Sequence, residues 1–218
     1  TQLEVALIGS CTNSSYEDIT RAASVAKQIV EKGIEFKTPL LVVPGSVRIY
    51  ETLKRDGVLQ YFEKLNATVL ADACGPCIGQ WKRTIGDSTK PNAIIESFNR
   101  NFAGRNDGSK KTNAFLASPE IVMAMVIAGD LTFNPLKGTF KAADGTNYQL
   151  KAPKGEELPK KGFVKEVKGC ILPTYEKIEI KVSPNAERIR LLEPFPAWDG
   201  KDFIELPLLI KAKGKCTT

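Results

Sequence analysis

Three cysteines follow apolar runs that have the character of buried strands, a position from which side chains can take part in chemistry. Cys11 follows an apolar run at residues 3–9, and Cys74 and Cys77 form a Cys-x-x-Cys pair after a second run at residues 67–71. Because open α/β sheets bind ligands beyond the carboxyl ends of their strands, we expect all three thiols at one sheet edge. A helix N-terminus at that edge would favour the thiolate, which is the form that binds metals.

A Cys-x-x-Cys pair by itself has several interpretations. Thioredoxin-like redox pairs, halves of zinc sites and parts of iron–sulfur sites all contain it, and Cys11 alone would be interpreted as a small buried residue. The chain has no histidine and no second Cys-x-x-Cys to complete a zinc tetrahedron. A four-iron cluster held by three cysteines leaves one iron open to water or substrate, and such an iron can act as a Lewis acid. The cysteines therefore favour a [4Fe-4S] cluster as cofactor.

A second set of candidate residues lies at 97–108, directly after another predicted strand. Arg100 and Arg105 stand there among glycines and asparagines, a setting in which arginines are often ordinary surface residues. At the same sheet edge as the thiols, however, their planar guanidinium groups would suit a substrate with several carboxylates. Asn99 can exchange hydrogen bonds with a cysteine sulfur, a sulfide or the substrate. We therefore predict that these three residues bind substrate.

The other two cysteines, Cys170 and Cys216, lack this placement, and we expect neither to be a cluster ligand. An odd total of five cysteines argues against a disulfide framework and for reduced thiols. The net charge is +6, but the lysines are dispersed and lack interleaved aromatics, which favours a solvated basic surface over a nucleic-acid site. No apolar run approaches the roughly 18 residues that a membrane span needs.

Apolar runs alternate with amphipathic segments over residues 3–128. The runs are nearly continuous in apolar and β-branched residues, as in strands that are buried on both faces. The segments between them have helical spacing; Gly33 suits the end of the first, and Ser118 suits the cap of the last. This alternation predicts an α/β fold with a mainly parallel sheet and flanking helices. The predicted strands are 3–9, 38–43, 67–71 and 92–98, and the predicted helices are 16–32, 47–55 and 119–128.

The remainder of the chain has a different character. Residues 135–169 are rich in Gly, Lys, Pro and Glu, which indicates a peripheral excursion rather than core. Strands are expected again within 178–192 and at 206–211. The opening directly in a strand suggests a segment of a longer polypeptide. We predict an α/β cluster-binding domain at residues 1–168, a linker at 169–190 and the incomplete start of a further domain at 191–218.

Three segments that carry the candidate residues resemble signature segments of the aconitase family. They are Ile-Gly-Ser-Cys-Thr-Asn-Ser at 8–14, Ala-Cys-Gly-Pro-Cys-Ile-Gly-Gln-Trp at 73–81 and Ser-Phe-Asn-Arg-Asn-Phe-Ala-Gly-Arg at 97–105. The first continues as Ser-Tyr-Glu-Asp at 15–18, which is similar to mitochondrial-type members. The resemblance spans essentially the whole chain, since 117–120, 192–195, 198–200 and 213–218 are similar too.

The resemblance implies a four-domain enzyme of which this chain supplies most of the third domain, the linker and the first strand of the swivelling fourth domain. No catalytic base is expected in this segment, because the family's serine base belongs to the fourth domain and its histidine and carboxylate partners belong to the first two. The implied partners are a small tricarboxylate substrate and the remaining domains of the same enzyme. The implied site residues are Cys11, Cys74 and Cys77 as ligands of the [4Fe-4S] cluster, Arg100 and Arg105 on substrate carboxylate, and Asn99 beside the cluster.

The implied activity is the isomerisation of citrate to isocitrate through cis-aconitate, a hydro-lyase step of the tricarboxylic acid cycle in the mitochondrial matrix. The intact enzyme would be required for turnover and is expected to be monomeric. Three alternatives remain. The first is a related hydro-lyase such as homoaconitase or isopropylmalate isomerase. The second is an RNA-binding apo form of a cytoplasmic relative, which the charge of +6 permits. The third is an electron carrier, which would want a fourth cysteine ligand.

Overall fold

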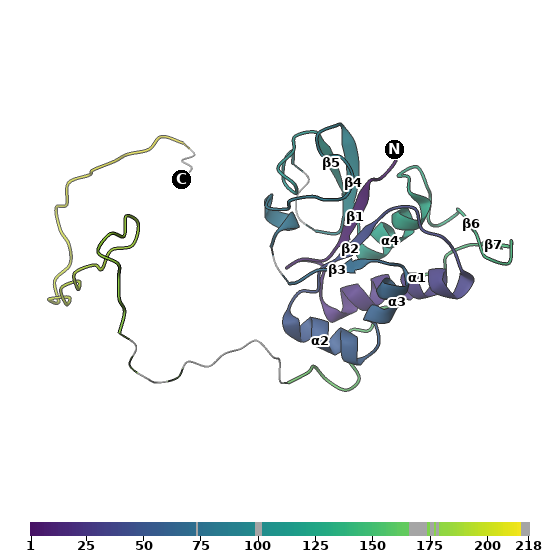
Figure 1. Cartoon of the computed structure of the whole chain (residues 1–218), viewed down its shortest axis with the longest axis horizontal. Helices are drawn as coiled ribbons and strands as arrows, with labels where there is room; N and C mark the ends of the chain where they lie inside the picture. The colour runs from purple at the N-terminus through teal and green to yellow at the C-terminus, as the bar shows by residue number, and fades with distance from the viewer. Residues whose placement is uncertain (73, 99–101, 166–173, 175–176, 178, 215–218) are drawn as a thin grey trace. The chain divides into compact units, whose positions relative to one another are not determined.

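The computed structural model describes the chain except for residues 73, 99–101, 166–173, 175–176, 178 and 215–218. Contacts within the chain divide it into two units, Thr1–Cys170 and Ile171–Thr218. All helices and strands of the described residues belong to the first unit (Figure 1). The first unit is therefore the folded body in which the candidate residues have to be located.

A five-stranded sheet forms the centre of the first unit. Its strands are β1 (Val5–Ile8), β2 (Leu40–Val42), β3 (Thr68–Val69), β4 (Asn92–Glu96) and β5 (Thr112–Leu116). They lie in the order β3-β2-β1-β4-β5, and every neighbouring pair is parallel. The chain winds outward from β1 to β3, returns beside β1 as β4, and winds the other way to β5. Open α/β sheets bind ligands where the order reverses in this way, which here is beyond the carboxyl ends of β1 and β4.

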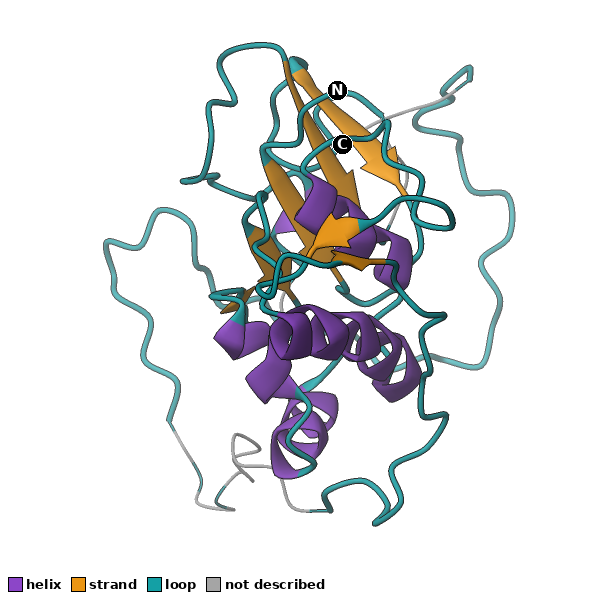
Figure 2. Cartoon of the chain, turned by 90° about the vertical axis from the view of Figure 1, so that its right-hand side faces the viewer, coloured by secondary structure: helices purple, strands orange, loops and turns teal. Residues whose placement is uncertain are grey.

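Helices pack together on one face of this sheet (Figure 2). They are α1 (Tyr16–Lys32), α2 (Val47–Arg55), α3 (Leu59–Lys64) and α4 (Pro119–Ala128). Local sequence sets the ends of α1, because Ser15 and Asp18 form a capping box at its start and Gly33 ends it in the left-handed conformation, with φ 57°. The long helix α1 contacts both α3 and α4, so it forms the middle of the helical layer.

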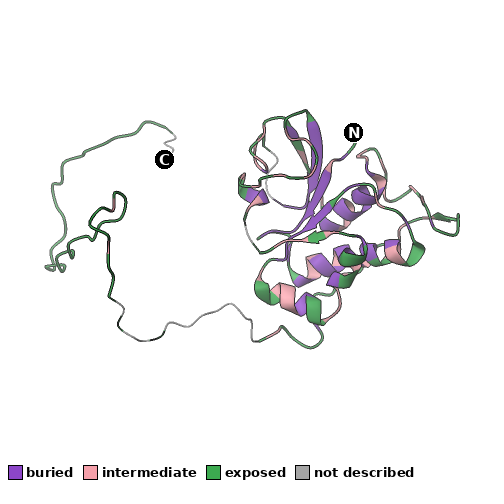
Figure 3. Cartoon of the chain, viewed as in Figure 1, coloured by how far each residue is buried: buried purple, intermediate pink, exposed green. Residues whose placement is uncertain are grey.

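The central strands β1, β2 and β4 are buried along their whole length (Figure 3), which explains why they are almost continuously apolar. Ala6 and Ile8 of β1 belong to the core beneath the helices. Val5 and Leu7, on the opposite face, belong to a second cluster that also contains Cys77. The loop that carries the Cys-x-x-Cys pair is therefore packed into the sheet rather than extended from it.

The predicted α/β fold with a mainly parallel sheet is confirmed, but two of its elements were not predicted. The edge strand β5 is only partly buried, so its sequence has no continuous apolar run. The helix α3 is six residues long and has no side-chain cap at its start, so no helix signal marks it.

The strands predicted within 178–192 and at 206–211 are wrong for the described part of the second unit, which contains neither helix nor strand. Its large apolar side chains are exposed, Leu209 at 91% and Phe195 at 86% among them. A strand needs a neighbour for its backbone hydrogen bonds and a surface for its apolar side chains. Within the excursion at 135–169, the chain forms a small antiparallel pair, β6 (Phe140–Lys141) and β7 (Asn147–Tyr148).

Candidate functional site

Hydrogen bonds join the residues that follow β1 and β4. The Gly9 N–H donates to Ser97 Oγ at 2.9 Å, and the side-chain amide of Asn13 donates to the Ser97 carbonyl oxygen. Gly9 has φ 78°, and a Cβ at this position would lie 2.1 Å from the Val43 carbonyl oxygen. Only glycine allows this conformation and this close approach. Cys11 therefore leaves the sheet beside the start of residues 97–109, which we call the arginine loop.

The other two thiols lie on the loop after β3, which we call the cysteine loop (residues 74–79). A short 3-10 helix, η1 (Pro76–Ile78), turns the chain there, and Gly79 ends the turn with φ 80°. Cys77 is only 2% exposed, and its Sγ donates to the Cys74 carbonyl oxygen at 3.2 Å. Cys11 and Cys74 are exposed. One thiol is thus fixed by packing, while two remain accessible at the surface.

The three thiols affect one another's ionisation. The pKa of the Cys11 thiol is lowered, mainly by hydrogen bonds from the hydroxyls of Thr12 and Ser10 and also by one from the Cys77 side chain. The pKa of the Cys74 thiol is raised, chiefly by the charge and hydrogen bonding of Cys77 and to a smaller extent by Cys11. Groups that shift each other's pKa in this way lie close together. Hydrogen bonds join Gly9 and Asn13, on either side of Cys11, and Pro76, between Cys74 and Cys77, to the residues that follow β4, so both loops that carry the thiols lie beside that segment.

The arrangement of the three thiols does not identify a metal site by itself. Within the described ranges, no group of three or more His, Cys, Asp or Glu side chains is arranged to hold one metal ion. In a four-iron cluster each cysteine binds a different iron, so the ligand sulfurs stand farther apart than they do around one ion. The assignment of the three thiols as ligands stays a prediction, as does the exclusion of Cys170 and Cys216, which lie outside the described residues.

Arg105 is the described arginine of the arginine loop, whereas Asn99 and Arg100 lie outside the described residues. Its guanidinium carbon lies 5.3 Å from the centroid of the Phe102 ring, a cation–π contact. Its Nε is buried and has no hydrogen-bond partner among the described residues. A guanidinium is suited to binding a carboxylate, and this role for Arg105 stays a prediction.

A buried ion pair anchors the arginine loop to the sheet. Arg83 Nη1 lies 3.3 Å from Asp107 Oδ2, and both side chains are 1% exposed. Arg83 also pairs with Glu4 and donates to Asn92 Oδ1 at 2.6 Å, while the Thr112 hydroxyl donates to Asp107 at 2.7 Å. The loop is therefore held by residues at the start of β4 and β5, and its position is set by rigid elements.

Glu96 and Asn106 lie beside the candidate site, and the sequence analysis did not single them out. Glu96 ends β4 and is fully buried, and burial raises the pKa of its carboxyl group to about 8, opposed by the hydrogen bond from Asn106 and the charge of Arg105. The Asn106 side-chain nitrogen donates to Glu96 and, at 3.2 Å, to the Pro76 carbonyl oxygen. A lone glutamate at the end of an otherwise apolar predicted strand was the available signal.

A model of the aconitase family (aconitate hydratase) matches residues 1–129 of this chain. The chain belongs to the aconitase family. The matched range includes the whole five-stranded sheet, the cysteine loop and the arginine loop. The family assignment therefore rests on the same part of the molecule that brings the thiols together.

Several curated relatives of this aconitase-family chain are named mitochondrial aconitate hydratases. The chain is 52% identical over 219 residues to the one from Gracilaria gracilis, with 100% of the chain covered. It is 49% identical over 218 residues to the one from Schizosaccharomyces pombe, with 100% covered, and 50% identical over 218 residues to the one from Saccharomyces cerevisiae, with 99% covered. The chain spans 28% of the length of each of these relatives.

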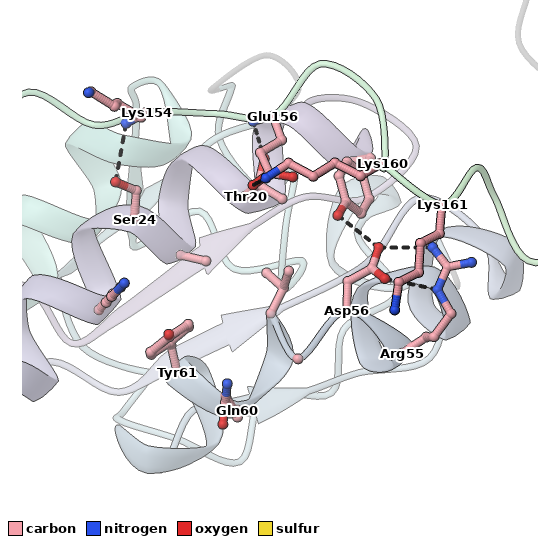
Figure 4. Close-up of a pocket in the computed structure, with 15 residues that line it drawn as sticks. Thr20, Ser24, Arg55, Asp56, Gln60, Tyr61, Lys154, Glu156, Lys160 and Lys161 are labelled. Carbon is pink, nitrogen blue, oxygen red and sulfur yellow. Dashed lines mark hydrogen bonds and ion pairs between the residues drawn. The ribbon is translucent and has the colours of Figure 1, made fainter.

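A cavity of about 540 Å³ in this aconitase-family chain lies on its helical side, between α1, the turn from α2 to α3, and residues 154–161 (Figure 4). Tyr16, Arg55 and Lys161 line it, but neither the described thiols nor Arg105 do. Arg55 and Asp56 form an ion pair there at 2.8 Å, and none of the lining side chains has a buried polar atom that lacks a hydrogen bond. The cavity is therefore distinct from the candidate site.

The segment beside this cavity is fastened along α1 by polar side chains on one helix face. The backbone N–H groups of Lys151, Lys154 and Glu156 donate to Gln28, Ser24 and Thr20 at 2.8, 3.1 and 2.9 Å. Gln28 contributes most, because its amide oxygen also accepts from the Tyr148 hydroxyl at 3.1 Å and its amide nitrogen donates to the Lys151 carbonyl oxygen at 3.2 Å. This helix face therefore fixes the path of the excursion.

Replacing Gln28 by alanine should lower the free energy of unfolding by about 1–2 kcal/mol, because several hydrogen bonds, some partly buried and some exposed, are lost at once. Urea denaturation of the chain measures the loss. Gln60→Ala is the matched control, since Gln60 is an exposed glutamine on α3 with no side-chain hydrogen bond among the described residues. Equal losses in the two variants would contradict the anchoring role of Gln28.

Proposed function

We propose that this chain is the cluster-binding part of an aconitate hydratase, a hydro-lyase that isomerises citrate to isocitrate through cis-aconitate in the tricarboxylic acid cycle. The observation that carries the proposal is that the loop of Cys11 and the loop of Cys74 and Cys77 are both hydrogen-bonded to the residues that follow β4. The arginine loop is in direct contact with the cysteine loop, because a Cβ at Gly79 would lie 3.5 Å from the Arg105 carbonyl oxygen. The similarity of the whole chain to relatives named aconitate hydratase supports the proposal.

The residues of this chain would bind and orient, and the rest of the enzyme would complete the chemistry. When bound, the [4Fe-4S] cluster would supply an electrophilic iron with an open position. The three cysteines would hold it, and Arg100 and Arg105 would bind carboxylates of the substrate, with Asn99 beside them. The proton-abstracting base would come from a part of the enzyme outside this chain. The isolated chain is therefore expected to be inactive.

Mild oxidation is expected to release a single iron from the reconstituted cluster and to give a three-iron signal in electron paramagnetic resonance. The reason is that three cysteines leave one iron without a protein thiolate. The experiment uses a full-length aconitase-family polypeptide that carries this chain, loaded with iron and sulfide. A cluster that keeps all its iron under the same treatment would indicate a fourth ligand and would favour an electron carrier.

Arg100→Lys and Arg105→Lys are expected to lower kcat/KM of that full-length enzyme by the equivalent of about 1–3 kcal/mol. Lysine keeps the charge but loses the two-pronged geometry that matches a carboxylate. Iron content and visible absorption should stay unchanged. Arg48→Lys makes the same exchange at an exposed position on α2 and serves as control. If activity falls only in step with iron content, these arginines support the cluster instead of the substrate.

The proposed partners are a small tricarboxylate and the remaining domains of the same enzyme, which we expect to be monomeric. We propose the mitochondrial matrix as its compartment, because the relatives are named mitochondrial. Their names also favour aconitate hydratase over homoaconitase, isopropylmalate isomerase and an RNA-binding form. None of the helices in the described part of the chain combines the length and apolar character that crossing a bilayer requires.

A further inference from the structure

Glu96 is a buried carboxyl group with an incomplete set of partners. Its side chain is fully buried, its Oε2 accepts a hydrogen bond from Asn106, and its Oε1 has no hydrogen-bond partner within the described residues. Burial of a carboxyl group in this state costs stability, because the charged form loses its hydration and one oxygen gains nothing in return. A residue that lowers stability and lies beside a candidate site is a candidate for a functional role in that site.

Asn106 connects Glu96 to the cysteine loop. Its side-chain nitrogen donates to Glu96 and to the Pro76 carbonyl oxygen at 3.2 Å, and the residue is 2% exposed. Pro76 stands inside the Cys-x-x-Cys sequence. Asn106, in the arginine loop, thus links the end of β4, 10 residues before it, with the cysteine loop, 30 residues before it.

Arg105, the residue before Asn106, complements Glu96. Its positive charge opposes the effect of burial on the Glu96 carboxyl group, so the two side chains are within electrostatic range of each other. Arg105 Nε and Glu96 Oε1 are both buried and both without a hydrogen-bond partner among the described residues. A buried guanidinium stabilises the ionised form of a buried carboxyl group, and a buried donor stabilises a buried acceptor.

We propose that Glu96 and Asn106 form a buried bridge that positions Arg105 relative to the cysteine loop, which makes both of them positioning residues for the carboxylate-binding arginine. Glu96 restrains the buried side of the guanidinium and leaves its other N–H groups for a substrate carboxylate. Asn106 fixes the position of the arginine loop relative to the cysteine loop. The inference rests on the proposed function in one respect, that Arg105 binds substrate.

The first test compares variants in a full-length aconitase-family polypeptide that carries this chain. Measured at about pH 9, where the Glu96 carboxyl group is ionised, Glu96→Gln keeps the size and the acceptor for Asn106 but removes the charge beside Arg105, and Asn106→Ala removes both hydrogen bonds. Each should raise KM for citrate about tenfold, with kcat changed less than about twofold and iron content unchanged. Adding Arg105→Lys to Glu96→Gln should change KM by less than it does alone, because both substitutions act on one guanidinium.

Glu120→Gln is the matched control. Its Oε2 is likewise buried without a hydrogen-bond partner in the described part of the chain, but it lies in the first turn of α4, in contact with Arg21. This variant should leave KM unchanged. A purely structural role predicts lower thermal stability with unchanged KM for Glu96→Gln and Asn106→Ala, and that result would overturn the bridge.

The second test needs no cluster and no activity. In the chain without iron, the exposed Cys74 thiol should react several-fold faster with a thiol reagent in Asn106→Ala, read by peptide mass mapping, while Glu96→Gln should react like the unmodified chain. Equal labelling rates in the two variants and the unmodified chain would contradict the proposal that Asn106 holds the cysteine loop. If the unmodified full-length enzyme does not isomerise citrate, the proposed function fails, and the labelling rates still decide whether Asn106 holds the cysteine loop. Should Asn106→Ala not fold, Asn106→Ser repeats both measurements.

Discussion

Serine in place of Cys77 is expected to abolish citrate isomerisation by a full-length aconitase-family polypeptide that carries this chain, and to remove its iron. A serine hydroxyl does not ionise readily enough to replace a thiolate on iron, and Cys77 is the thiol that interacts with both of the others. The fold should survive, because serine is close to cysteine in size and can still donate to the Cys74 carbonyl oxygen. Burying its hydroxyl should cost about 1–2 kcal/mol. Iron and sulfide content, visible absorption and the isomerase assay measure these effects.

Cys170→Ser is the matched control for that experiment, because the sequence analysis gives Cys170 no ligand role. It should keep iron and activity. Cys11→Ser and Cys74→Ser should behave like Cys77→Ser, although both residues are exposed, because each removes one of three ligands. A Cys77→Ser enzyme that keeps its cluster would show that the ligand assignment is wrong.

The position of the thiols could be predicted because local sequence determines it. Gly9 and Gly79 mark turns that only glycine makes easily, and an apolar run before each turn identifies a strand, buried in β1 and more exposed in β3. Once the strands are parallel, their carboxyl ends share an edge, and residues that follow them must meet there. Cys11 and the cysteine loop are close for this reason, with no long-range information needed.

The second unit and the edge strand β5 could not be predicted in the same way. The described apolar side chains of the second unit, such as Ile210 at 85% exposed, have strand-like spacing but no described sheet to pair with. Strand formation depends on a partner, and a pattern of side chains does not supply one. In β5 the partner exists, since Ala114 pairs with Ile94, but the pattern is weak.

The bridge of Glu96 and Asn106 depends on contacts that no spacing rule reports. Asn106 stands in a loop rich in Gly and Asn, where such residues usually serve the turn itself. Its two acceptors, on β4 and on the cysteine loop, are 10 and 30 positions away in the sequence. Rules for reading a sequence expect an apolar residue at a buried strand position, and they do not explain why a buried carboxyl group stands there instead.

The cost of burying Glu96 leads to a prediction about stability and pH. The pKa of this carboxyl group is about 8 in the folded chain against an ordinary value of 4.5, because burial disfavours its charged form. Below about pH 4.5 the folded and unfolded states both carry the proton, and the free energy of unfolding contains no contribution from this group. Between about pH 4.5 and pH 8 the folded state keeps a proton that the unfolded state has released, so stability falls as pH rises. Above about pH 8 both states are ionised and the loss is complete.

Glu96→Gln removes this titration while keeping the shape of the side chain. The variant should match the unmodified chain near pH 4.5 and exceed it in free energy of unfolding by on the order of 3 kcal/mol at about pH 9, a value set by the pKa difference and reduced for water penetration. Urea denaturation across this range measures the gap, with Glu120→Gln as the same exchange on another element. A gap that does not change with pH would mean that the carboxyl group is hydrated in the folded chain. A gap that widens with pH, together with a raised KM in the full-length enzyme, would mean that this chain retains Glu96 at the expense of stability because Arg105 depends on it.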